Sequence, residues 1–557
     1  MSGWQQHLII LPILIPLFAA VALVPMDETR RRSKVAIGVV AVLLQLAVAL
    51  YWVVVADRVE GSAPAAVYLL ANWDSPVAIS LALDRLNALM LLLNAVLAIA
   101  ALIFAAAKWD RVGVHFHVLF QLLLMGINGA FLTNDLFNLF VFFEVMLAAS
   151  YGLLLHGSGR VRVKAGLHYI AVNLVASSIF LVGVALMYSA SGTLNMADMA
   201  YKVATLGAAD RQLFETGAAV LAVAFLIKSA IWPLNFWLPA SYGAAVAPVS
   251  AIFAIMTKVG FYVLLRLWLL VFGESAGVSS SFGAAWLVGL GLITLGYAIF
   301  GMLAATNFKR FAGFSVIASA GTLLTAIPLG GSQGTAAALY YLLASTLAVA
   351  AFYLLVDLLD RIRDFSASLL AVTIESFEAE GMILPEESEV GVAIPAAMAF
   401  LALSFGLCLL VLSGLPPLSG FVGKFALLVS ALGSEAGSAM QYAVWLFVIL
   451  LVVAGFAATL TLTRLGIQLF WVPERHKKPR LRLAEAGPLT ALIGLTVLIT
   501  LAAGPVLGYL QRAADALHAP AAYIEGVLGA LPKDRQATPS QHSSLLSGEH
   551  EDEGARL

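Results

Sequence analysis

Apolar runs of about 20 residues recur along almost the whole chain, and each is long enough to cross a hydrocarbon core of about 30 Å as an α-helix. Within lipid, a spanning segment must satisfy its own backbone polar groups, which favours helices. The composition agrees, because 61% of the 557 residues are hydrophobic and 11% are charged. A soluble domain has roughly 25% charged residues. The sequence therefore predicts an all-α polytopic membrane protein.

About fourteen runs reach this length, with boundaries that are soft by a few residues. The first run precedes basic residues instead of following them, which is the reverse of a secretory signal, so we expect it to remain as the first span. The runs lie at 4–25, 34–56, 84–107, 113–132, 135–155, 164–190, 217–238, 245–271, 283–305, 308–329, 335–358, 391–432, 439–470 and 487–511.

Lysine and arginine gather in the loops after the first, third, fifth, ninth, eleventh and thirteenth runs, whereas the loops after the fourth, eighth, tenth and twelfth have none. Loops rich in these residues stay on the cytoplasmic side of a membrane. The alternation predicts that both termini lie on the outer face. The basic residues are Arg30 to Lys34, Lys108, Arg111, Arg160, Arg162, Lys164, Lys309, Arg310, Arg361, Arg363 and Arg475 to Arg482.

Three stretches are predicted to lie outside the bilayer. Residues 58–82 show short strand-like alternation, which predicts an extracytoplasmic hairpin. Residues 360–390 carry several glutamates and are expected to form a solvated cytoplasmic loop, with the gathering of cations as the alternative. The tail after Pro532 is polar, which favours disorder.

Several function classes find no support in the composition. The formal net charge of −1 gives no basis for nucleic-acid binding. The single cysteine, Cys408, lies in an apolar run and is expected to serve packing, since it has no internal partner for a disulfide. We find no haem, flavin or nucleotide signature and no set of converging carboxylates for a hard cation, so we expect neither a cofactor nor a bound metal.

Two of the predicted spans are interrupted. In the stretch Leu226 to Gly260, Pro233 and Pro239 break the helical pattern, and a GLPPLSG motif at 414–420 interrupts the long run 391–432. Proline removes a backbone hydrogen bond, and a broken membrane helix is tolerated only beside protein or a water-filled cavity. Both breaks therefore predict a site within the bundle.

The interrupted spans occupy matching places in the chain. Spans four to eight and nine to thirteen each contain five helices, and the fourth helix of each set is broken near a lysine. An odd number of helices gives two copies of opposite topology, which is the pattern of transporters built from inverted repeats. The predicted division is an N-terminal unit 1–112, a first repeat 113–271, a second repeat 272–470, a last helix 471–511 and a polar C-terminal tail 512–557.

Three ionisable residues lie deep in the predicted spans. Glu144 follows Asp135 by about 13.5 Å of helix, Lys228 follows Gly217 by about 16 Å, and Lys258 is similarly deep. A charge at the bilayer centre costs about 2.5–3.5 kcal/mol on insertion scales, so such residues usually face other helices and serve the transported species. A Glu144–Lys228 pair would couple two titrations. A static salt bridge between helices is the alternative.

Two further residues extend this set. Lys424 follows the second break by a few residues, and its alternative interpretation is a lysine near a helix end. His168 could join Glu144 and Lys228 in a relay, because imidazole titrates near neutral pH, or it could simply occupy a helix face.

Three motifs resemble a known family. They are TNDLFNLFVFFEVMLAASYGL with Glu144, KSAIWPLNFWLPASYGAAVAPVSA with Lys228, and SGLPPLSGFVGKF with Lys424, and TRLGIQLFWVPE at 463–474 fits as well. Together they resemble the D component of the Mrp-type multisubunit monovalent cation/proton antiporters. The resemblance covers roughly residues 60–510. The same superfamily includes the antiporter-like subunits of respiratory complex I and of related membrane hydrogenases.

The resemblance implies a fold of fourteen helices with two inverted five-helix repeats and discontinuous helices 7 and 12. It also implies a proton relay along a hydrated mid-membrane axis, onto which Glu144, Lys228, Lys258 and Lys424 map. The implied partners are the other subunits of the antiporter, membrane lipids, H⁺, and Na⁺ or K⁺. The implied location is the bacterial inner membrane. A lysine at the last position is similar to the antiporter D component, whereas some complex I relatives carry glutamate there.

The chain departs from the family pattern at one place. Many members carry a histidine in helix 11, where this chain has YYLLASTLA. Without that histidine, the resemblance implies that a proton crosses from Lys258 to Lys424 on waters held by hydroxyl groups. Hydroxyls order water but do not store charge at neutral pH. The candidates are Ser315, Ser319, Tyr340, Ser345 and Thr346.

Three functions stay open at this point. The first is a secondary transporter subunit that conducts protons and is coupled to Na⁺ or K⁺ efflux. The second is a proton-pumping subunit of a redox-driven, complex I-like enzyme, which would need partners that carry the cofactors. The third is a scaffold that assembles a transporting partner without conducting ions itself.

Overall fold

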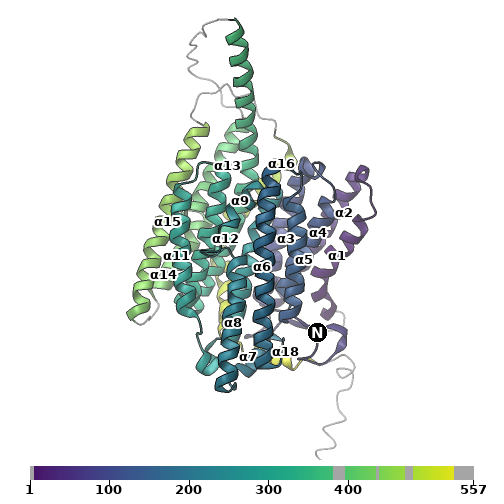
Figure 1. Cartoon of the computed structure of the whole chain (residues 1–557), viewed down its shortest axis with the longest axis vertical. Coiled ribbons are helices and arrows are strands. Elements are labelled where there is room, and N and C mark those ends of the chain that lie inside the picture. The colour runs from purple at the N-terminus through teal and green to yellow at the C-terminus, as the bar shows by residue number, and fades with distance from the viewer. Residues whose placement is uncertain (1–4, 381–395, 434–437, 471–480, 532–557) are drawn as a thin grey trace, which may run out of the picture.

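The computed structural model describes residues 5–380, 396–433, 438–470 and 481–531. Over these ranges the chain is a bundle of long helices that lie side by side (Figure 1). Ten of the described helices are long and apolar enough to cross a membrane, and three shorter apolar helices join them. The predicted all-α polytopic fold is confirmed, while the count of fourteen spans stays a prediction.

The described elements alternate helices with short connections. The helices of the first half are α1 (Leu11–Leu23), α2 (Arg31–Asp57), α3 (Arg85–Ala107), α4 (Phe116–Leu132), α5 (Leu136–Leu154), α6 (Arg160–Ser191), α7 (Met196–Val203), α8 (Ala208–Lys228), α9 (Trp237–Ala244) and α10 (Ala247–Val271). Those of the second half are α11 (Ala284–Leu303), α12 (Phe308–Glu380), α13 (Ala396–Ser413), α14 (Ser419–Leu432), α15 (Ser438–Phe470), α16 (Leu483–Leu501), α17 (Ala503–His518) and α18 (Ala521–Leu528). The strands are β1 (Ala66–Leu69) and β2 (Ser80–Leu83), and the short 3₁₀ helices are η1 (Gln5–Ile10), η2 (Glu28–Arg30), η3 (Leu70–Asn72), η4 (Trp109–Arg111) and η5 (Glu274–Ser279).

The first predicted break separates α8 from α9. Ala230 takes the left-handed conformation with φ of 56°, and the N–H of Ile231 donates to the carbonyl of Leu226 at 2.9 Å. This closure is a Schellman-type helix end, in which a left-handed residue turns the chain away. Pro233 follows and has no N–H with which to continue the helix.

The second predicted break separates α13 from α14 and ends its first helix in the same way. Gly414 takes the left-handed conformation with φ of 75°, and the N–H of Leu415 donates to the carbonyl of Leu410 at 2.9 Å. Pro416 comes next. Both breaks predicted from proline and glycine are confirmed, and the two helix ends share one geometry.

The helix α12 reverses direction at Gly331, where φ is 55° and ψ is −149°. Its two halves lie antiparallel, because an ion pair of 2.9 Å joins Lys309 near the start of the first half to Asp360 in the second. The halves correspond to the runs 308–329 and 335–358 that the sequence predicts as separate spans.

The second half of α12 also continues to Glu380, whereas the sequence analysis predicts a solvated loop over 360–390. That prediction was wrong for residues up to 380. The segment 361–380 contains neither glycine nor proline, and its glutamate, alanine and leucine residues are good helix formers. The rest of the predicted loop lies outside the described residues, as does the tail after Leu531.

One end of the bundle carries the predicted hairpin. Strands β1 and β2 pair antiparallel, with Ala66 opposite Leu83 and Leu69 opposite Ser80. The C-terminal helices reach the same end, where Tyr523 of α18 donates a hydrogen bond to Asn134 at 3.1 Å. We call this the hairpin end. The helices α17 and α18 therefore occupy part of the region that the sequence analysis assigns to a polar tail.

The opposite end, which we call the basic end, is joined by ion pairs between helices. Arg31 binds Asp110 with two hydrogen bonds, of 2.6 and 2.8 Å. Arg361 of α12 pairs with Glu485 of α16 at 2.5 Å. The first contact joins α2 to η4 and the second joins α12 to α16, at the face where the sequence places most of its lysine and arginine.

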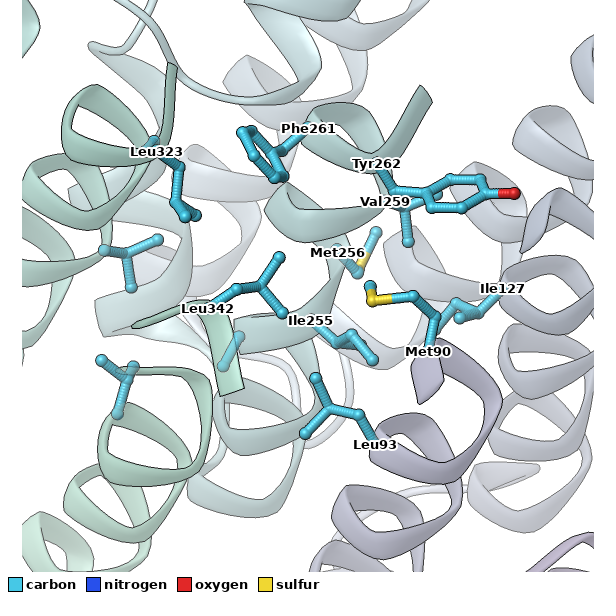
Figure 2. Packing of buried hydrophobic residues seen from close by; sticks show 14 of the residues in the cluster. Met90, Leu93, Ile127, Ile255, Met256, Val259, Phe261, Tyr262, Leu323 and Leu342 are labelled. Atoms are coloured by element: carbon cyan, nitrogen blue, oxygen red, sulfur yellow. The ribbon is translucent and has the colours of Figure 1, made fainter. Parts of the chain in front are cut away.

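The helix α10 is enclosed by protein, since all of its most apolar 18-residue window is buried. Figure 2 shows this packing, in which side chains of α3, α4 and α12 meet those of α10. An ionisable side chain in the middle of α10 therefore faces other helices and not lipid. The labelled residues are Met90, Leu93, Ile127, Ile255, Met256, Val259, Phe261, Tyr262, Leu323 and Leu342.

A contact between helices supports the predicted repeats. A Cβ atom placed on Gly129 of α4 would overlap the ring of Phe142 in α5. A Cβ atom on Gly301 of α11 would overlap the ring of Phe314 in α12 in the same way. The phenylalanine follows the glycine by 13 residues in both pairs. The first two helices of each predicted repeat thus approach one another through the same glycine–phenylalanine contact.

We predict that Asp110→Asn destabilises the folded protein at neutral pH. Burial opposes the ionisation of Asp110, but the nearby His117, whose Nε2 lies 3.5 Å from Oδ2, and the hydrogen-bonded Arg31 outweigh it and hold the pKa of this carboxyl below its ordinary 3.8. Because the folded pKa is lowered, the stabilisation is present above the unfolded pKa and is lost as the pH falls through the folded one. Removing one partner of a buried ion pair costs about 3–5 kcal/mol, and we expect less here because 27% of the Arg31 side chain is exposed.

The measurement is thermal unfolding of the detergent-purified protein at pH 7, with Asp27→Asn as the control. Asp27 is exposed and its side chain caps no helix. Equal midpoints for Asp110→Asn and the wild type at pH 7 would contradict the assigned role of this ion pair.

Candidate ion-transfer site

Lys228 and Glu144 come together beside the first break. Lys228 is the last residue of α8, is 7% exposed, and its Nζ lies 4.9 Å from the centre of the Phe143 ring in α5. Glu144, the next residue of α5, accepts a hydrogen bond from Ser177 of α6. The lysine thus lies on the ring of the residue next to Glu144, and no direct ion pair joins the two charged groups. The structure therefore shows neighbouring charges and not the closed salt bridge of the alternative interpretation.

Two features stabilise Lys228 at this position. The C-terminus of a helix carries a partial negative charge, which favours an ammonium group in the last turn. The face of an aromatic ring also attracts a cation within about 6 Å. The neighbouring carbonyl of Ile227 accepts a hydrogen bond from the indole N–H of Trp237 at 3.2 Å, so the break leaves this group satisfied.

Lys258 lies at the centre of α10 and is 2% exposed. Its Nζ donates a hydrogen bond of 2.7 Å to Ser319 in the first half of α12. The hydroxyl of Ser319 is 3.1 Å from the hydroxyl of Ser345 in the second half. The structure thus connects the central lysine to two of the hydroxyl residues expected from the sequence.

Lys424 caps the end of the helix that precedes its own. Its Nζ donates to the carbonyl of Ser413 at 2.7 Å, and Ser413 is the last residue of α13. A Cβ atom on Gly414 would lie 2.5 Å from Cδ of this lysine, so glycine is needed for the side chain to pass. Lys424 at this break therefore binds a carbonyl at the end of α13.

A cavity of about 30 Å³ lies between Ser345 and Lys424, and both residues line it. A single water molecule needs roughly 10–15 Å³, so the cavity has room for about two. Other polar residues of its lining are Ser315, Thr322 and Tyr341. The space between the central and the terminal lysine is therefore large enough and polar enough for water.

The structure keeps three candidate residues away from this path. Tyr340 donates to the carbonyl of Ile499 in α16 at 3.2 Å, Thr346 donates to the carbonyl of Leu342 in its own helix at 2.6 Å, and neither residue lines the cavity. His168 is exposed, and its Nδ1 lies 2.8 Å from the carbonyl oxygen of Lys164 in its own helix.

Sequence reasoning missed three polar residues of the site, namely Ser177, Thr322 and Tyr341. Thr322 shares a helix face with Ser315 and Ser319, and this spacing of hydroxyls in an apolar run was a usable signal. Tyr341 adjoins the candidate Tyr340, and only the rotation of the helix decides which of the two reaches the cavity.

A buried charged cluster near the hairpin end was also missed. Arg266 of α10 pairs with Asp84 at 2.6 Å and donates to Asn87 at 2.5 Å. Tyr262 of α10 donates to the carbonyl of Phe131 at 2.7 Å. These residues join α10 to α3 and α4. Lys258, two turns from Arg266 on α10, lies outside this network.

Within the described residues, no group of three or more His, Cys, Asp or Glu side chains is arranged to hold a metal ion. The titratable groups of the site are instead spread along the bundle as single residues.

Comparison with known proteins identifies the family. The transmembrane family described as NADH:quinone oxidoreductase/Mrp antiporter matches residues 133–457. A protein of Rhizobium meliloti, named as the D component of a probable K(+)/H(+) antiporter, is 51% identical over 538 residues, which cover 95% of this chain and 99% of that protein. The chain belongs to the D-component family of Mrp-type antiporters. The D component of the Na(+)/H(+) antiporter of Alkalihalophilus pseudofirmus is 31% identical and covers 94% of this chain and 100% of its own length.

Solved structures share the fold of this chain. A chain of the Mrp complex from Dietzia sp. DQ12-45-1b superposes with a TM-score of 0.78 at 27% identity, over 95% of this chain and 100% of that one. A chain of respiratory complex I from Thermus thermophilus superposes with a TM-score of 0.69 at 22% identity, over 92% and 99%, which shows a shared fold. The D component is a multi-pass membrane protein and part of an ion transporter.

We predict that Gly414→Ala destabilises the protein and displaces Lys424. The added methyl group would meet the lysine stem at 2.5 Å, and φ is 75° at this position. The left-handed conformation costs a residue with a Cβ atom roughly 1–2 kcal/mol. Gly406→Ala in α13 is the control, because a Cβ atom there meets nothing within 4 Å. Thermal unfolding of the purified protein should show a lower midpoint for Gly414→Ala alone, and equal midpoints for the two variants would refute the packing described.

Proposed function

We propose that this antiporter subunit conducts protons by sequential protonation of Glu144, Lys228, Lys258 and Lys424. The observation that carries the proposal is the chain of contacts from Lys258 through Ser319 to Ser345, which ends at the polar cavity beside Lys424. A proton that leaves Lys258 can move along these hydroxyls and through water to Lys424. Hydroxyl groups both donate and accept hydrogen bonds, as such a transfer requires.

The first half of the relay depends on the break after α8. The backbone there approaches α10 closely, since a Cβ atom on Gly260 would lie 2.6 Å from the hydroxyl of Ser229. Ser229 directly follows Lys228, and Gly260 comes two residues after Lys258. Both lysines therefore lie beside this one contact between the break and α10. Glu144 alters the charge balance at Lys228, so that a proton arriving at one group changes the affinity of the other.

The proton movement is coupled to the outward transport of a monovalent cation by the complex. The relative that is 51% identical is named for K⁺/H⁺ exchange, whereas those at 31% and 30% identity are named for Na⁺/H⁺ exchange. These identities favour K⁺. The other subunits of the antiporter are the partners, the bacterial inner membrane is the location, and both termini lie on the outer face, as the distribution of Lys and Arg indicates.

We predict that Glu144→Gln and Lys258→Ala each lower cation-dependent proton flux by about 100-fold, the typical contribution of one proton-transferring side chain. The measurement uses the assembled complex in sealed vesicles, with a pH-sensitive dye and K⁺ or Na⁺ added separately. Lys202→Ala is the matched control, because it removes a lysine that pairs with Asp198 near the hairpin end. Exchange at the wild-type rate in either relay variant, with normal assembly, would reject the relay.

The same assay separates conduction from a scaffold role. Gly301→Ala disturbs helix packing against Phe314 and leaves every relay residue in place. If the protein served only as a scaffold, Gly301→Ala would abolish exchange and Lys258→Ala would preserve it. The relay requires that Lys258→Ala abolish exchange in complexes that assemble normally.

A further inference from the structure

A second cavity lies at the basic end, outside the four relay positions. Its volume is about 50 Å³, and its polar lining includes Arg162, Ser250, Lys309, Tyr353 and Asp357. The backbone between α9 and α10 forms another part of its wall. At roughly 10–15 Å³ for each water molecule, the cavity has room for several.

Tyr353 shows that this cavity is built for a polar occupant. Its side chain is 3% exposed, it lines the cavity, and its hydroxyl has no hydrogen-bond partner among the described residues. An unsatisfied buried hydroxyl costs about 1–3 kcal/mol. Water in the cavity would supply the missing partner.

Asp357 places a carboxylate at the same cavity. Arg361 donates to its Oδ2 at 2.5 Å, and the Trp109 indole donates to the same oxygen at 3.4 Å. Its Oδ1 receives no hydrogen bond within the described part of the chain and is the oxygen available to accept a proton. The charged groups around it are Arg361 on its own helix, Lys309 from the first half of α12, Arg162 from α6, and Lys108 after α3.

One face of α12 connects this cavity to the relay. Asp357, Tyr353, Val349 and Ser345 are spaced four residues apart, so they share a face of the helix over about 18 Å. Asp357 and Tyr353 line the second cavity, which we call the outer cavity. Val349 and Ser345 line the cavity beside Lys424, which we call the inner cavity. Ser345 leads through Ser319 to Lys258. Val349 lies between Ser345 and Tyr353 in this series, and its side chain is apolar.

We propose that this face of α12 is the proton-release route of the antiporter subunit, with Val349 as an apolar constriction, Tyr353 as the group that orders water beyond it, and Asp357 as the last acceptor. The proposal rests on the proposed relay and names its exit, since a cation that moves outward requires protons that move toward the basic end. The ammonium group of Lys424 releases a proton to water in the cavity beside it, and the proton passes Val349 to water at Tyr353. The carboxylate of Asp357 accepts this proton, becomes neutral, and regains its charge when it releases the proton to bulk water at the basic end. Apolar constrictions gate such routes by excluding water.

The deciding variant is Tyr353→Phe, which removes one oxygen from a site where it has no partner among the described residues. In the assembled complex in vesicles, we expect it to slow cation-dependent proton flux by about tenfold, and Asp357→Asn to slow it by about 100-fold. Asp357→Glu, which keeps both the carboxylate and its charge beside Arg361, should restore most of the rate. Tyr297→Phe is the control, since this tyrosine of α11 is 38% exposed and lines neither cavity.

A second readout is the proton concentration at the basic end that halves the flux by opposing proton release. Loss of the last acceptor shifts this concentration, whereas a packing defect lowers the flux equally at every proton concentration or lowers the yield of complex. Wild-type flux in Tyr353→Phe and Asp357→Asn, with Lys258→Ala inactive, would overturn the release route and leave the relay standing. Wild-type flux in Lys258→Ala as well would overturn both.

Discussion

An ammonium group in the middle of a membrane must be stabilised by neighbouring dipoles, hydroxyls or carbonyls, and this requirement shapes the protein. Each of the three buried lysines meets it differently. Lys228 occupies the C-terminal turn of α8 and the face of an aromatic ring, Lys258 binds the hydroxyl of Ser319, and Lys424 binds the carbonyl of Ser413. Among the described residues, none of the three forms a direct ion pair. A lysine stabilised by dipoles and hydroxyls can change its protonation without leaving a carboxylate buried alone, which suits a group that passes protons on.

The broken helices provide these dipoles. Both breaks end a helix with a left-handed residue and then a proline, and both expose carbonyl groups inside the bundle. At the first break the carbonyl of Ile227 accepts hydrogen bonds from the Ala230 N–H and the Trp237 indole, and at the second break Lys424 donates to the carbonyl of Ser413. Glycines on the facing helices, Gly260 on α10 and Gly455 on α15, allow close approach to each break. The two breaks therefore share one backbone geometry and differ in the side chains that bind the carbonyl groups beside them.

Much of the fold follows from the sequence, because span length, proline and the position of a charge within a run are local properties. The two breaks, the hairpin and the depth of Lys258 could be read directly. The prediction of a loop over 360–390 was wrong up to residue 380, because glutamate is also a good helix former and the segment 361–380 has no helix breaker. The contacts between residues of the candidate site were harder to predict from the sequence, since a helix turns by about 100° per residue. That rotation brings Tyr341, and not Tyr340, to the inner cavity, and it turns His168 outward. Asp357 and Arg266 escaped notice because their surroundings come from distant segments.

The central claim is that protons cross between the lysines through water held by hydroxyl groups. An experimental structure of the assembled complex in lipid, at a resolution that shows ordered water, tests it most directly. The account predicts water density between Ser345 and Lys424, within hydrogen-bond distance of Ser315 or Tyr341. A cavity closed by apolar side chains, with no water between these residues, would contradict it.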